Sequence, residues 1–385
     1  MIDYHALRGS FRELYSHEPR LFRAPGRVNL IGEHTDYNDG WVLPMAIRFD
    51  TLVAGATRED RRVRVRSQNL DEDAEFDLDT PGPPKRGIWL DYVEGVARAL
   101  ESRGLRLQGA DLLIQSDVPV GAGLSSSAAL EISVGLALLS LSGQELDPVS
   151  LALAGQQAEH EYVGTRSGIM DQLIATLGRV DHALLIDCRS LEATQIPLDT
   201  SKVAVVICDT NVKHELASSE YNTRRAECER GVEILRGVMP DIRALRDVSV
   251  ADFERFGSLL PEPIRQRCRH VISENQRTLA AAEFLRNGDL AAMGKLMGLS
   301  HRSLRDDYQV SSPELDLLVD IAWTARGVLG ARMTGGGFGG STVNLVGRDC
   351  LDEFHQTIAG EYSRAMGIQP SIYVSEAAGG AEEMR

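Results

Sequence analysis

Cysteine is scarce and unpaired in this chain. Five cysteines are scattered over 385 residues, and no two of them form a CxxC motif. The odd count and the wide spacing argue against a disulfide framework and against a zinc site. We therefore expect reduced thiols and a cytoplasmic protein.

Positive charge is the second shortage. The chain has 41 Lys and Arg residues against 56 Asp and Glu residues, which gives a formal net charge of −15. Proteins that bind polyanions usually carry a basic surplus or a basic stripe. The main cationic run, residues 62–66, alternates arginine with valine, and this predicts the solvent face of a strand. No nucleic-acid partner is predicted.

Long apolar runs are absent as well. No stretch approaches the roughly 18 uninterrupted apolar residues of a membrane span, and residues 1–10 include Asp3, His5 and Arg8 without an apolar core. Neither a membrane span nor a signal peptide is predicted. The composition is otherwise that of a globular protein, with 43% hydrophobic and 25% charged residues, and the length suggests two or three domains.

The pattern of apolar and polar residues predicts strands in runs and helices in runs, which favours an α+β fold over a regular βαβ fold. The predicted strands are residues 40–47, 51–57, 62–67, 110–116, 183–187 and 203–209. The predicted helices are residues 89–100, 126–141, 151–162 and 168–177, and residues 219–297 are mostly helical. A boundary near residues 195–202 divides the chain into domains 1–200 and 201–385. The C-terminal residues 376–385 are expected to fray.

A short apolar run, residues 28–31, is flanked by Gly26 and Gly32 and predicts a strand that leads into a polar turn. Four hydrogen-bonding side chains follow within five residues: Glu33, His34, Asp36 and Tyr37. Carboxylates accept hydrogen bonds and histidine accepts or donates, so this set suits a ligand with many hydroxyls, such as a sugar. A site of this kind rejects analogues that lack a hydroxyl. An ordinary polar turn after a strand explains the composition equally well.

A segment rich in glycine and serine precedes the apolar helix predicted at 126–141. Gly121 and Gly123 let the backbone approach a ligand closely, and residues 125–127 are three serines in a row. The start of a helix offers free N–H groups and the positive end of its dipole, which suits a phosphate group. The GxxxxGK(S/T) pattern of a Walker A loop does not occur in the chain. A serine cap after a glycine turn is the simpler alternative, but a cap needs only one of the three serines.

A second glycine-rich segment lies near the C-terminus. Residues 335–340 contain five glycines in six positions, and three of them fit the spacing GxGxxG. A dinucleotide-binding fingerprint must open a helix, whereas residues 341–346 predict a strand, so the Rossmann interpretation is rejected. Because glycine lets the backbone pass close to a ligand or to another backbone, the segment still predicts a close approach of one kind or the other.

Two carboxylates lie inside predicted helices. Asp171 is in the first turn of the helix at 168–177, where the helix dipole favours the anionic form, and ordinary charge placement at a helix start is the default explanation. Glu159 lies among polar neighbours in the helix at 151–162, where a solvated helix face is the default.

Together, the three segments resemble the GHMP kinase superfamily and, within it, the galactokinase family. Residues 26–37 match the galactokinase signature without a departure, residues 121–129 match the nucleotide loop of the superfamily, and residues 335–340 match its third motif. The matching segments keep the family's order over residues 23–342. The resemblance implies two α+β domains with the active site between them. The first is expected to be like the second domain of ribosomal protein S5, and the second to be ferredoxin-like.

The resemblance also implies a role for each matching residue. Asp171 corresponds to the catalytic aspartate, and Arg27 to the arginine that stabilises transferred charge and keeps that aspartate ionised. Sugar contacts are implied for Glu33, His34, Thr35, Asp36, Gly168 and Tyr221. Nucleotide contacts are implied for Ser67, Trp89, Gly121, Ala122, Gly123, Leu124, Ser125, Ser126 and Ser127. Ser127 and Glu159 correspond to ligands of Mg²⁺.

The implied activity is the phosphorylation of the C1 hydroxyl of galactose by MgATP, the first committed step of galactose breakdown in the Leloir pathway. Galactose and ATP are then the partners, Mg²⁺ is the metal, and no obligate protein partner is expected. A kinase of a related sugar, N-acetylgalactosamine or arabinose, is an alternative, because the pocket near C2 and C6 decides among these sugars. A sugar-sensing regulator without activity is another, although the complete serine loop with Asp171 and Arg27 weighs against it.

Overall fold

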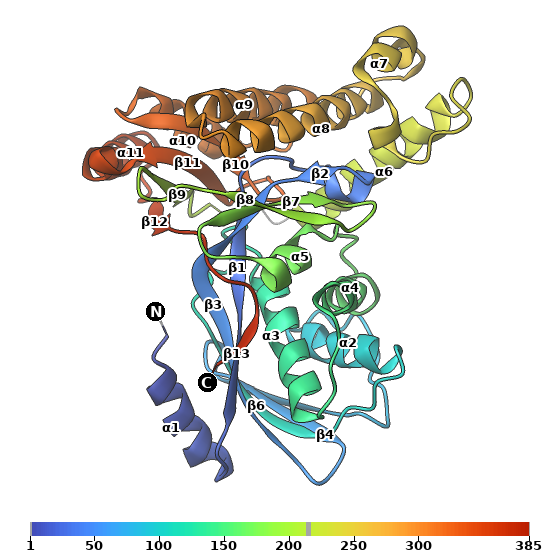
Figure 1. Cartoon of the computed structure of the whole chain (residues 1–385), viewed down its shortest axis with the longest axis vertical. Helices are drawn as coiled ribbons and strands as arrows, with labels where there is room; N and C mark the ends of the chain where they lie inside the picture. Colours follow the sequence, from blue (N-terminus) through green and yellow to red (C-terminus); the bar gives the residue numbers. More distant parts are fainter. Residues whose placement is uncertain (1, 213–216, 385) are drawn as a thin grey trace.

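A six-stranded sheet forms the lower half of the molecule in Figure 1. In the computed structural model, which describes residues 2–212 and 217–384, its strand order is β13-β1-β3-β6-β4-β5. Its strands are β1 (Arg20–Asn29), β3 (Pro44–Thr57), β4 (Arg62–Ser67), β5 (Glu72–Asp77), β6 (Ala110–Ser116) and β13 (Glu382–Met384). The alternation in β4 buries Val63 and Val65 and exposes Arg62 and Arg64, as predicted.

Helices cover both faces of this sheet. They are α1 (Tyr4–Tyr15), α2 (Leu90–Glu101), α3 (Ser126–Leu141), α4 (Pro148–Ala158) and α5 (Met170–Leu177). On one face, α1 packs Leu7 and Phe11 against the sheet, while α2 and α3 lie on the other face. The predicted bounds and the burial of α3 are confirmed, since the helix is apolar all round and packs against β1, β3, α2 and α4.

The two remaining sheets and the helices from α6 to α11 lie in the upper half of Figure 1. The four-stranded sheet has the order β10 (Val328–Thr334), β11 (Ser341–Gly347), β9 (Val203–Asp209), β12 (Ser371–Ser375). The three-stranded sheet has the order β2 (Trp41–Val42), β7 (His182–Asp187), β8 (Ala193–Pro197). The helices are α6 (Ala217–Leu235), α7 (Val250–Phe256), α8 (Ile264–Arg286), α9 (Leu290–Ser303), α10 (Pro313–Thr324) and α11 (Leu351–Met366). Short helical turns are η1 (Asp36–Asn38), η2 (Glu159–Val163), η3 (Leu245–Asp247), η4 (Gly257–Leu259), η5 (Leu304–Tyr308) and η6 (Arg348–Cys350).

One apolar cluster joins the two halves. It contains Leu30 and Leu43 from the N-terminal part together with Val205 of β9, Val343 of β11 and Met297 of α9. The end of β1, and the polar turn that follows it, are therefore held between the lower sheet and the C-terminal elements. The proposed division between residues 200 and 201 falls in the loop before β9 and stays a prediction.

The two strands predicted at 40–47 and 51–57 form one long strand, β3, preceded by the short β2. The polar residues between the two predicted strands mark the point where β3 passes from one apolar cluster to another. Met45 and Ile47 pack in the cluster that joins the two halves, whereas Leu52 and Ala54 pack under α1. The backbone continues through the polar middle because β1 pairs with it there, across a register shift between Pro25 and Arg27.

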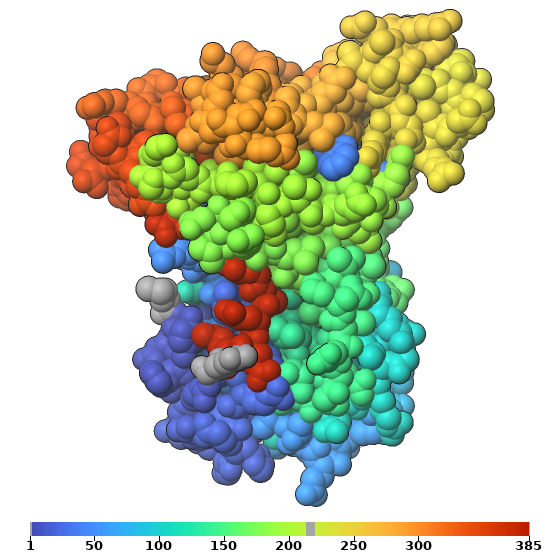
Figure 2. Space-filling model, viewed as in Figure 1, coloured from blue at the N-terminus to red at the C-terminus, as the bar shows by residue number. Residues whose placement is uncertain are grey.

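The prediction of a frayed C-terminal segment is wrong for β13. Residues 382–384 pair with β1, and Arg20 and Arg23 bind Glu383 and Glu382 across that pairing. Figure 2 shows the red C-terminal segment lying against the lower half of the molecule, beside the blue N-terminal part. Backbone pairing and ion pairs hold these residues at the edge of the sheet, so the strand forms without an apolar pattern that the sequence could reveal.

Within residues 2–212 and 217–384, no helix combines the length and the apolar character that crossing a bilayer requires.

Candidate active site

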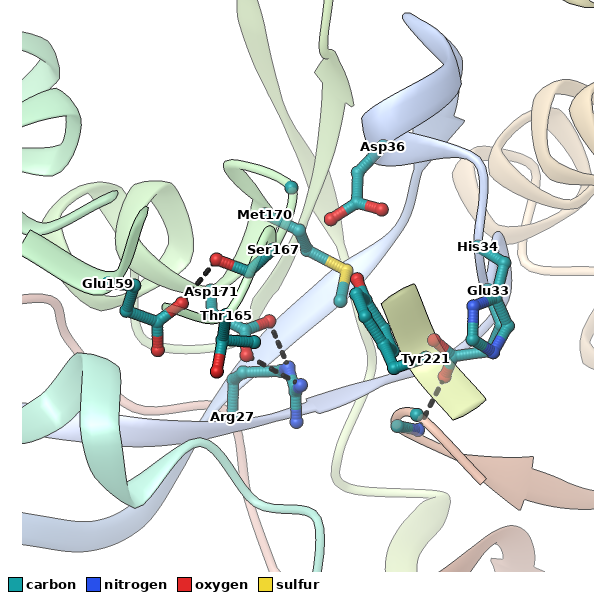
Figure 3. A pocket seen from close by; sticks show the side chains of 13 residues that line it. Arg27, Glu33, His34, Asp36, Glu159, Thr165, Ser167, Met170, Asp171 and Tyr221 are labelled. Atoms are coloured by element: carbon teal, nitrogen blue, oxygen red, sulfur yellow. Dashed lines mark hydrogen bonds and ion pairs between the residues drawn. The ribbon is translucent and has the colours of Figure 1, made fainter. Parts of the chain in front are cut away.

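One pocket collects residues from five separate parts of the chain, and Figure 3 shows its side chains converging. They come from the end of β1, the turn before η1, the segment from η2 to α5, the start of α6 and the glycines after β10. The lining residues are Arg27, Glu33, His34, Asp36, Glu159, Thr165, Ser167, Gly168, Met170, Asp171, Tyr221, Gly335 and Gly336. Seven of the eight residues predicted for catalysis or sugar contact are among them.

An ion pair lies on the floor of this pocket. Arg27 Nε and Nη2 donate to the two carboxylate oxygens of Asp171 at 2.7 and 2.8 Å, and Arg27 Nη1 donates to the carbonyl of Gly123 at 2.6 Å. Burial disfavours the guanidinium charge, but the carboxylates of Asp171, Glu33 and Asp36 together outweigh it and raise the pKa of Arg27. Ser125 Oγ also donates to Asp171. The pair thus links the start of α5 to the serine loop.

Glu33 is held from two sides. Its Oε1 accepts hydrogen bonds from Gly335 N at 2.8 Å and from Thr334 Oγ1 at 3.3 Å, and Arg332 Nη2 lies 3.5 Å away. Burial raises the pKa of Glu33, and the charges of Arg332 and Arg27 oppose that rise. The third glycine motif therefore contributes a backbone donor to the sugar signature.

Asp36 reaches the pocket from η1 and has few partners. Its Oδ1 accepts from Tyr37 N at 3.0 Å. Burial, followed by the nearby charge of Asp171, raises the pKa of Asp36 to about 7. A Cβ atom on Gly168 would lie 1.8 Å from Asp36 Oδ2, so a glycine at position 168 is what gives this carboxylate its room. Asp36 is therefore a partly exposed acceptor whose remaining capacity faces the pocket.

Two aromatic groups complete this side of the pocket. His34 has a φ of 62° and lies with its ring centroid 5.6 Å from that of Tyr221 on α6. Burial lowers the pKa of His34 well below its usual value, so the ring is neutral.

Thr35 is the one residue predicted to contact the sugar that does not line this pocket. Its hydroxyl lies 2.8 Å from Gly32 O and 2.7 Å from Trp41 O, and its contact with a sugar stays a prediction.

The serine loop is not built as a simple cap. Gly121 and Gly123 have φ values of 84° and 73°, a region that favours glycine. Ser125 stands at the N-cap of α3, but its side chain makes no capping bond and donates to Asp171 instead. The backbone N–H groups at the start of α3 are thus left for another acceptor, which favours the anion-binding interpretation over the capping one.

Glu159 is buried at 7% exposure, so the interpretation as a solvated helix face is wrong. The helix predicted at 151–162 ends as α4 at Ala158, and Glu159 opens the π-helical turn η2 that aims its side chain inward. Its carboxylate accepts from Ser127 Oγ at 3.0 Å and from Ser167 Oγ. Burial raises the pKa of Glu159, and the hydrogen bonds from Ser167 and Ser127 oppose that rise.

The donors Ser127 and Glu159 fit a magnesium ion in part. A buried carboxylate beside a hydroxyl is a hard oxygen pair of the kind that Mg²⁺ prefers. In the part of the chain that the structure describes, no group of three His, Cys, Asp or Glu residues could hold a metal. Such a site therefore needs further oxygens from phosphate and water, as magnesium sites beside nucleotides usually do.

A second pocket lies on the other side of the serine loop. Ser67 and Trp89, far apart in the sequence, line it together with Ser126 and Ser127. The rest of its wall is formed by Thr51, Asn69, Leu70, Tyr92, Ile114, Ser116, Val120 and Leu130. Four of the nine predicted nucleotide residues thus line one largely apolar cavity, whereas residues 121–125 do not line it. Contact of all nine with a nucleotide stays a prediction.

The third glycine motif lines the first pocket and also passes close to another stretch of backbone. Gly335 and Gly336 line the first pocket, and a Cβ atom on Gly335 would lie 3.0 Å from the carbonyl oxygen of Gly123. Ser341 Oγ donates to Ala122 O at 2.7 Å, so this motif supports the serine loop from behind.

Sequence reasoning missed Thr165, Ser167, Met170 and Arg332. Ser167 and Thr165 precede a helix and look like ordinary loop residues, and only the fold turns them toward Glu159 and the pocket. Arg332 is fully buried inside β10, and a lone arginine in a strand gives no sequence signal of a buried role.

Comparisons with known proteins agree with this geometry. Residues 9–57 match the family model of the galactokinase galactose-binding signature, residues 91–179 match that of the GHMP kinase N-terminal domain, and residues 281–349 match that of the GHMP kinase C-terminal domain. Galactokinases of Chloroflexus aurantiacus and Actinobacillus succinogenes are 52% and 45% identical to the chain. Each alignment covers 97% of this chain, and 96% and 97% of those proteins.

Solved structures place the fold in the same group. Lactococcus lactis galactokinase complexed with galactose superposes with a TM-score of 0.95 at 37% identity over 99% of both chains. Methanococcus jannaschii mevalonate kinase has a TM-score of 0.65 at 18% identity, covering 94% of this chain and 99% of its own, and shares the fold alone.

The fold, the serine loop and the two domain models define a kinase of the GHMP superfamily, an ATP-dependent enzyme that phosphorylates small molecules. Within that superfamily, the chain belongs to the galactokinase family, and its function is that of a galactokinase.

Proposed function

We propose that this chain transfers the γ-phosphoryl group of MgATP to the C1 hydroxyl of galactose and does so in the cytoplasm. The observation that carries the proposal is the position of the Arg27–Asp171 ion pair, between the sugar-signature carboxylates on one side and the serine loop on the other. A hydroxyl bound beside Glu33 and Asp36 would face a phosphate bound at the start of α3. The galactose complex of the Lactococcus lactis relative supports the sugar assignment.

Asp171 is proposed to orient the acceptor hydroxyl and to take its proton late. Phosphoryl transfer passes through a loose transition state in which the attacking oxygen has formed little bonding, so early removal of its proton is not required. Both oxygens of Asp171 already accept hydrogen bonds, two from Arg27 and one from Ser125, which fixes the plane of the carboxylate. Arg27 is proposed to offset negative charge on the transferred group.

Ser127 and Glu159 are proposed to hold Mg²⁺ together with phosphate oxygens and water. When bound, the ion neutralises phosphate charge and sets the position of the phosphate group. Ser127 lies at the start of α3 and Glu159 is already within hydrogen-bond distance of it, so both groups are in place on rigid elements. Ser167 is the neighbour that keeps Glu159 turned inward.

Magnesium dependence checks this assignment. Ser127→Ala and Glu159→Gln are each expected to raise the Mg²⁺ concentration at half-maximal rate, with partial rescue by excess Mg²⁺ through mass action. The measurement is turnover against free Mg²⁺ at fixed ATP. Ser133→Ala is a matched control, since this buried serine on the same helix bonds only the carbonyl of Leu130. An unchanged Mg²⁺ profile in both variants would remove these residues from the metal site.

Sugar choice tests the proposed substrate directly. Glucose differs from galactose only at C4, and kcat/KM for glucose is expected to be at least ~10²-fold lower because polar-built sites reject a misplaced hydroxyl strongly. The panel is galactose, glucose, 2-deoxygalactose, N-acetylgalactosamine and arabinose, assayed by ADP release. Equal use of glucose would contradict the proposal. A preference for N-acetylgalactosamine or arabinose would indicate a kinase of that related sugar. Absence of turnover with every sugar would indicate the sugar-sensing regulator.

Acidity should weaken sugar use. With the pKa of Asp36 near 7, kcat/KM for galactose is expected to rise with pH up to about 7 and then level off, since kcat/KM follows ionisation in the free enzyme. Asp36→Asn is expected to flatten this limb of the profile.

The free energy of unfolding should depend on pH in the opposite direction. Because the pKa of Asp36 in the folded protein lies above that in the unfolded chain, the contribution of Asp36 to the free energy of unfolding is lost as pH rises toward 7.

A further inference from the structure

The two ring nitrogens of His34 have different surroundings. Nδ1 lies 2.7 Å from the hydroxyl of Tyr37, whereas Nε2 is buried and has no hydrogen-bond partner among the residues that the structure describes. The residue is 4% exposed and lines the sugar pocket. An unpartnered buried nitrogen on the pocket wall is expected to meet a ligand, because leaving it unpaired is costly.

A chain of hydrogen bonds continues behind Nδ1, away from the pocket. Tyr37 Oη lies 2.8 Å from Tyr308 Oη, and Tyr308 Oη lies 3.2 Å from Cys228 Sγ. The four groups come from the turn before η1, from η1, from η5 and from α6. Tyr308 is fully buried and Cys228 is a buried free thiol. His34, a residue of the sugar signature, is thus joined to three residues that do not line the pocket.

Each hydroxyl has one proton, so the chain of bonds has one direction at a time. If the Cys228 thiol donates to Tyr308, Tyr308 donates to Tyr37 and Tyr37 donates to Nδ1, leaving the proton of the neutral ring on Nε2. If the direction is reversed, Nδ1 carries the proton and Nε2 becomes an acceptor. The tautomer of His34 therefore decides whether the ring offers a sugar a donor or an acceptor.

The geometry points to the first direction. A separation of 2.7 Å is usual when a hydroxyl donates, and lies at the short end of the range when a ring N–H donates to oxygen. The pocket also needs a donor, because the carboxylate of Glu33 and, once it is ionised, that of Asp36 can only accept. The sugar hydroxyls donate to these carboxylates and then require a protein donor for their own lone pairs.

We propose that Tyr37, Tyr308 and Cys228 are positioning residues that hold His34 in the Nε2–H tautomer, so that His34 donates a hydrogen bond to a ring hydroxyl of the sugar. The inference rests on the proposed function for the identity of the ligand. The tautomer itself is a property of the free protein and is measured without substrate.

The test is ¹⁵N NMR of the whole chain labelled with [¹⁵N]histidine, with the His34 signals assigned by their loss in His34→Asn. The wild type is expected to show Nε2 protonated and Nδ1 bare, and Tyr37→Phe to shift the population toward the other tautomer. Tyr308→Phe is expected to give a smaller shift, because Tyr37 keeps its hydroxyl. Tyr362→Phe is the matched control, since its buried hydroxyl bonds only the carbonyl of Thr210.

Kinetics supply the second arm. Tyr37→Phe is expected to lower kcat/KM for galactose about tenfold, the size of one hydrogen bond, with KM for ATP unchanged. In a panel of 2-, 3-, 4- and 6-deoxygalactose, the analogue that lacks the partner hydroxyl of His34 should lose little further activity in this variant. A wild-type ring protonated on Nδ1, a tautomer unchanged in Tyr37→Phe, or equal losses for every analogue would each overturn the inference. A wild type that ignores galactose but shows the expected tautomer would instead overturn the proposed function.

Discussion

Asp171→Asn is expected to lower kcat by at least ~10²-fold, the low end of general acid–base effects. The substitution keeps the size of the side chain, removes the charge that pairs with Arg27 and replaces one carboxylate oxygen with an amide nitrogen, so no basic oxygen remains to receive the proton. Affinity for the sugar is expected to stay within about tenfold, a shift of roughly 1.4 kcal/mol, because Glu33, His34 and Asp36 are proposed to supply the contacts with the ring.

The measurement is turnover at saturating galactose and ATP, with thermal unfolding as the check on folding. Asp147→Asn serves as the matched control. Asp147 also stands at a helix start, where its carboxylate accepts from Ser150 N at 2.9 Å, but it is outside the pocket. Its loss should cost about 1 kcal/mol of stability or less and leave kcat unchanged. A folded Asp171→Asn enzyme with near-normal turnover would remove Asp171 from the proposed mechanism.

Gly168→Ala is expected to reduce kcat/KM for galactose by at least ~10²-fold while leaving KM for ATP unchanged, because a site built on polar contacts fails when one of them is displaced. The new Cβ atom would lie 1.8 Å from Asp36 Oδ2 and 2.0 Å from Asp36 Cγ, so the whole carboxyl must rotate out of its place. The effect should pass through Asp36 alone. The double variant Gly168→Ala/Asp36→Ala is therefore expected to be no worse than Asp36→Ala.

Gly360→Ala separates this effect from a general effect of adding a methyl group. Gly360 lies within α11, and no atom within 4 Å would meet its Cβ, so the variant should gain up to about 1 kcal/mol of stability with unchanged kinetics. Additive losses in the double variant, or normal galactose use by Gly168→Ala, would show that Asp36 is not the group that this glycine accommodates.

Local pattern predicted the elements that have one clear face or are buried all round. β4, β6, β9 and α3 have the predicted bounds because alternation or continuous apolar sequence reports burial directly. The pattern failed where long-range pairing decided the outcome. β13 has no apolar alternation and exists because β1 offers it an edge, and β3 runs unbroken through a polar stretch because its partner continues beside it.

The candidate site divides in the same way. The motifs predicted the residues of the pocket, but two default explanations failed only when the fold was seen. Glu159 is buried because a π-helical turn rotates it inward, and Ser125 does not cap α3 because Asp171 takes its hydroxyl. The residues next to Glu159 and Ser125 in the sequence do not predict either arrangement.

Residue types and short spacings were sufficient to predict the chemistry of this protein: a polar cluster suited to a sugar, a loop suited to phosphate, and motifs that resemble one kinase family. They were sufficient because they act locally, through helix starts, turns and backbone freedom. The tertiary structure alone decided which of these groups meet. Arg27 and Asp171 are 144 residues apart, and Glu33 and Gly335 are 302 apart, so only the packing of the sheets around a shared core brings each pair within 3 Å.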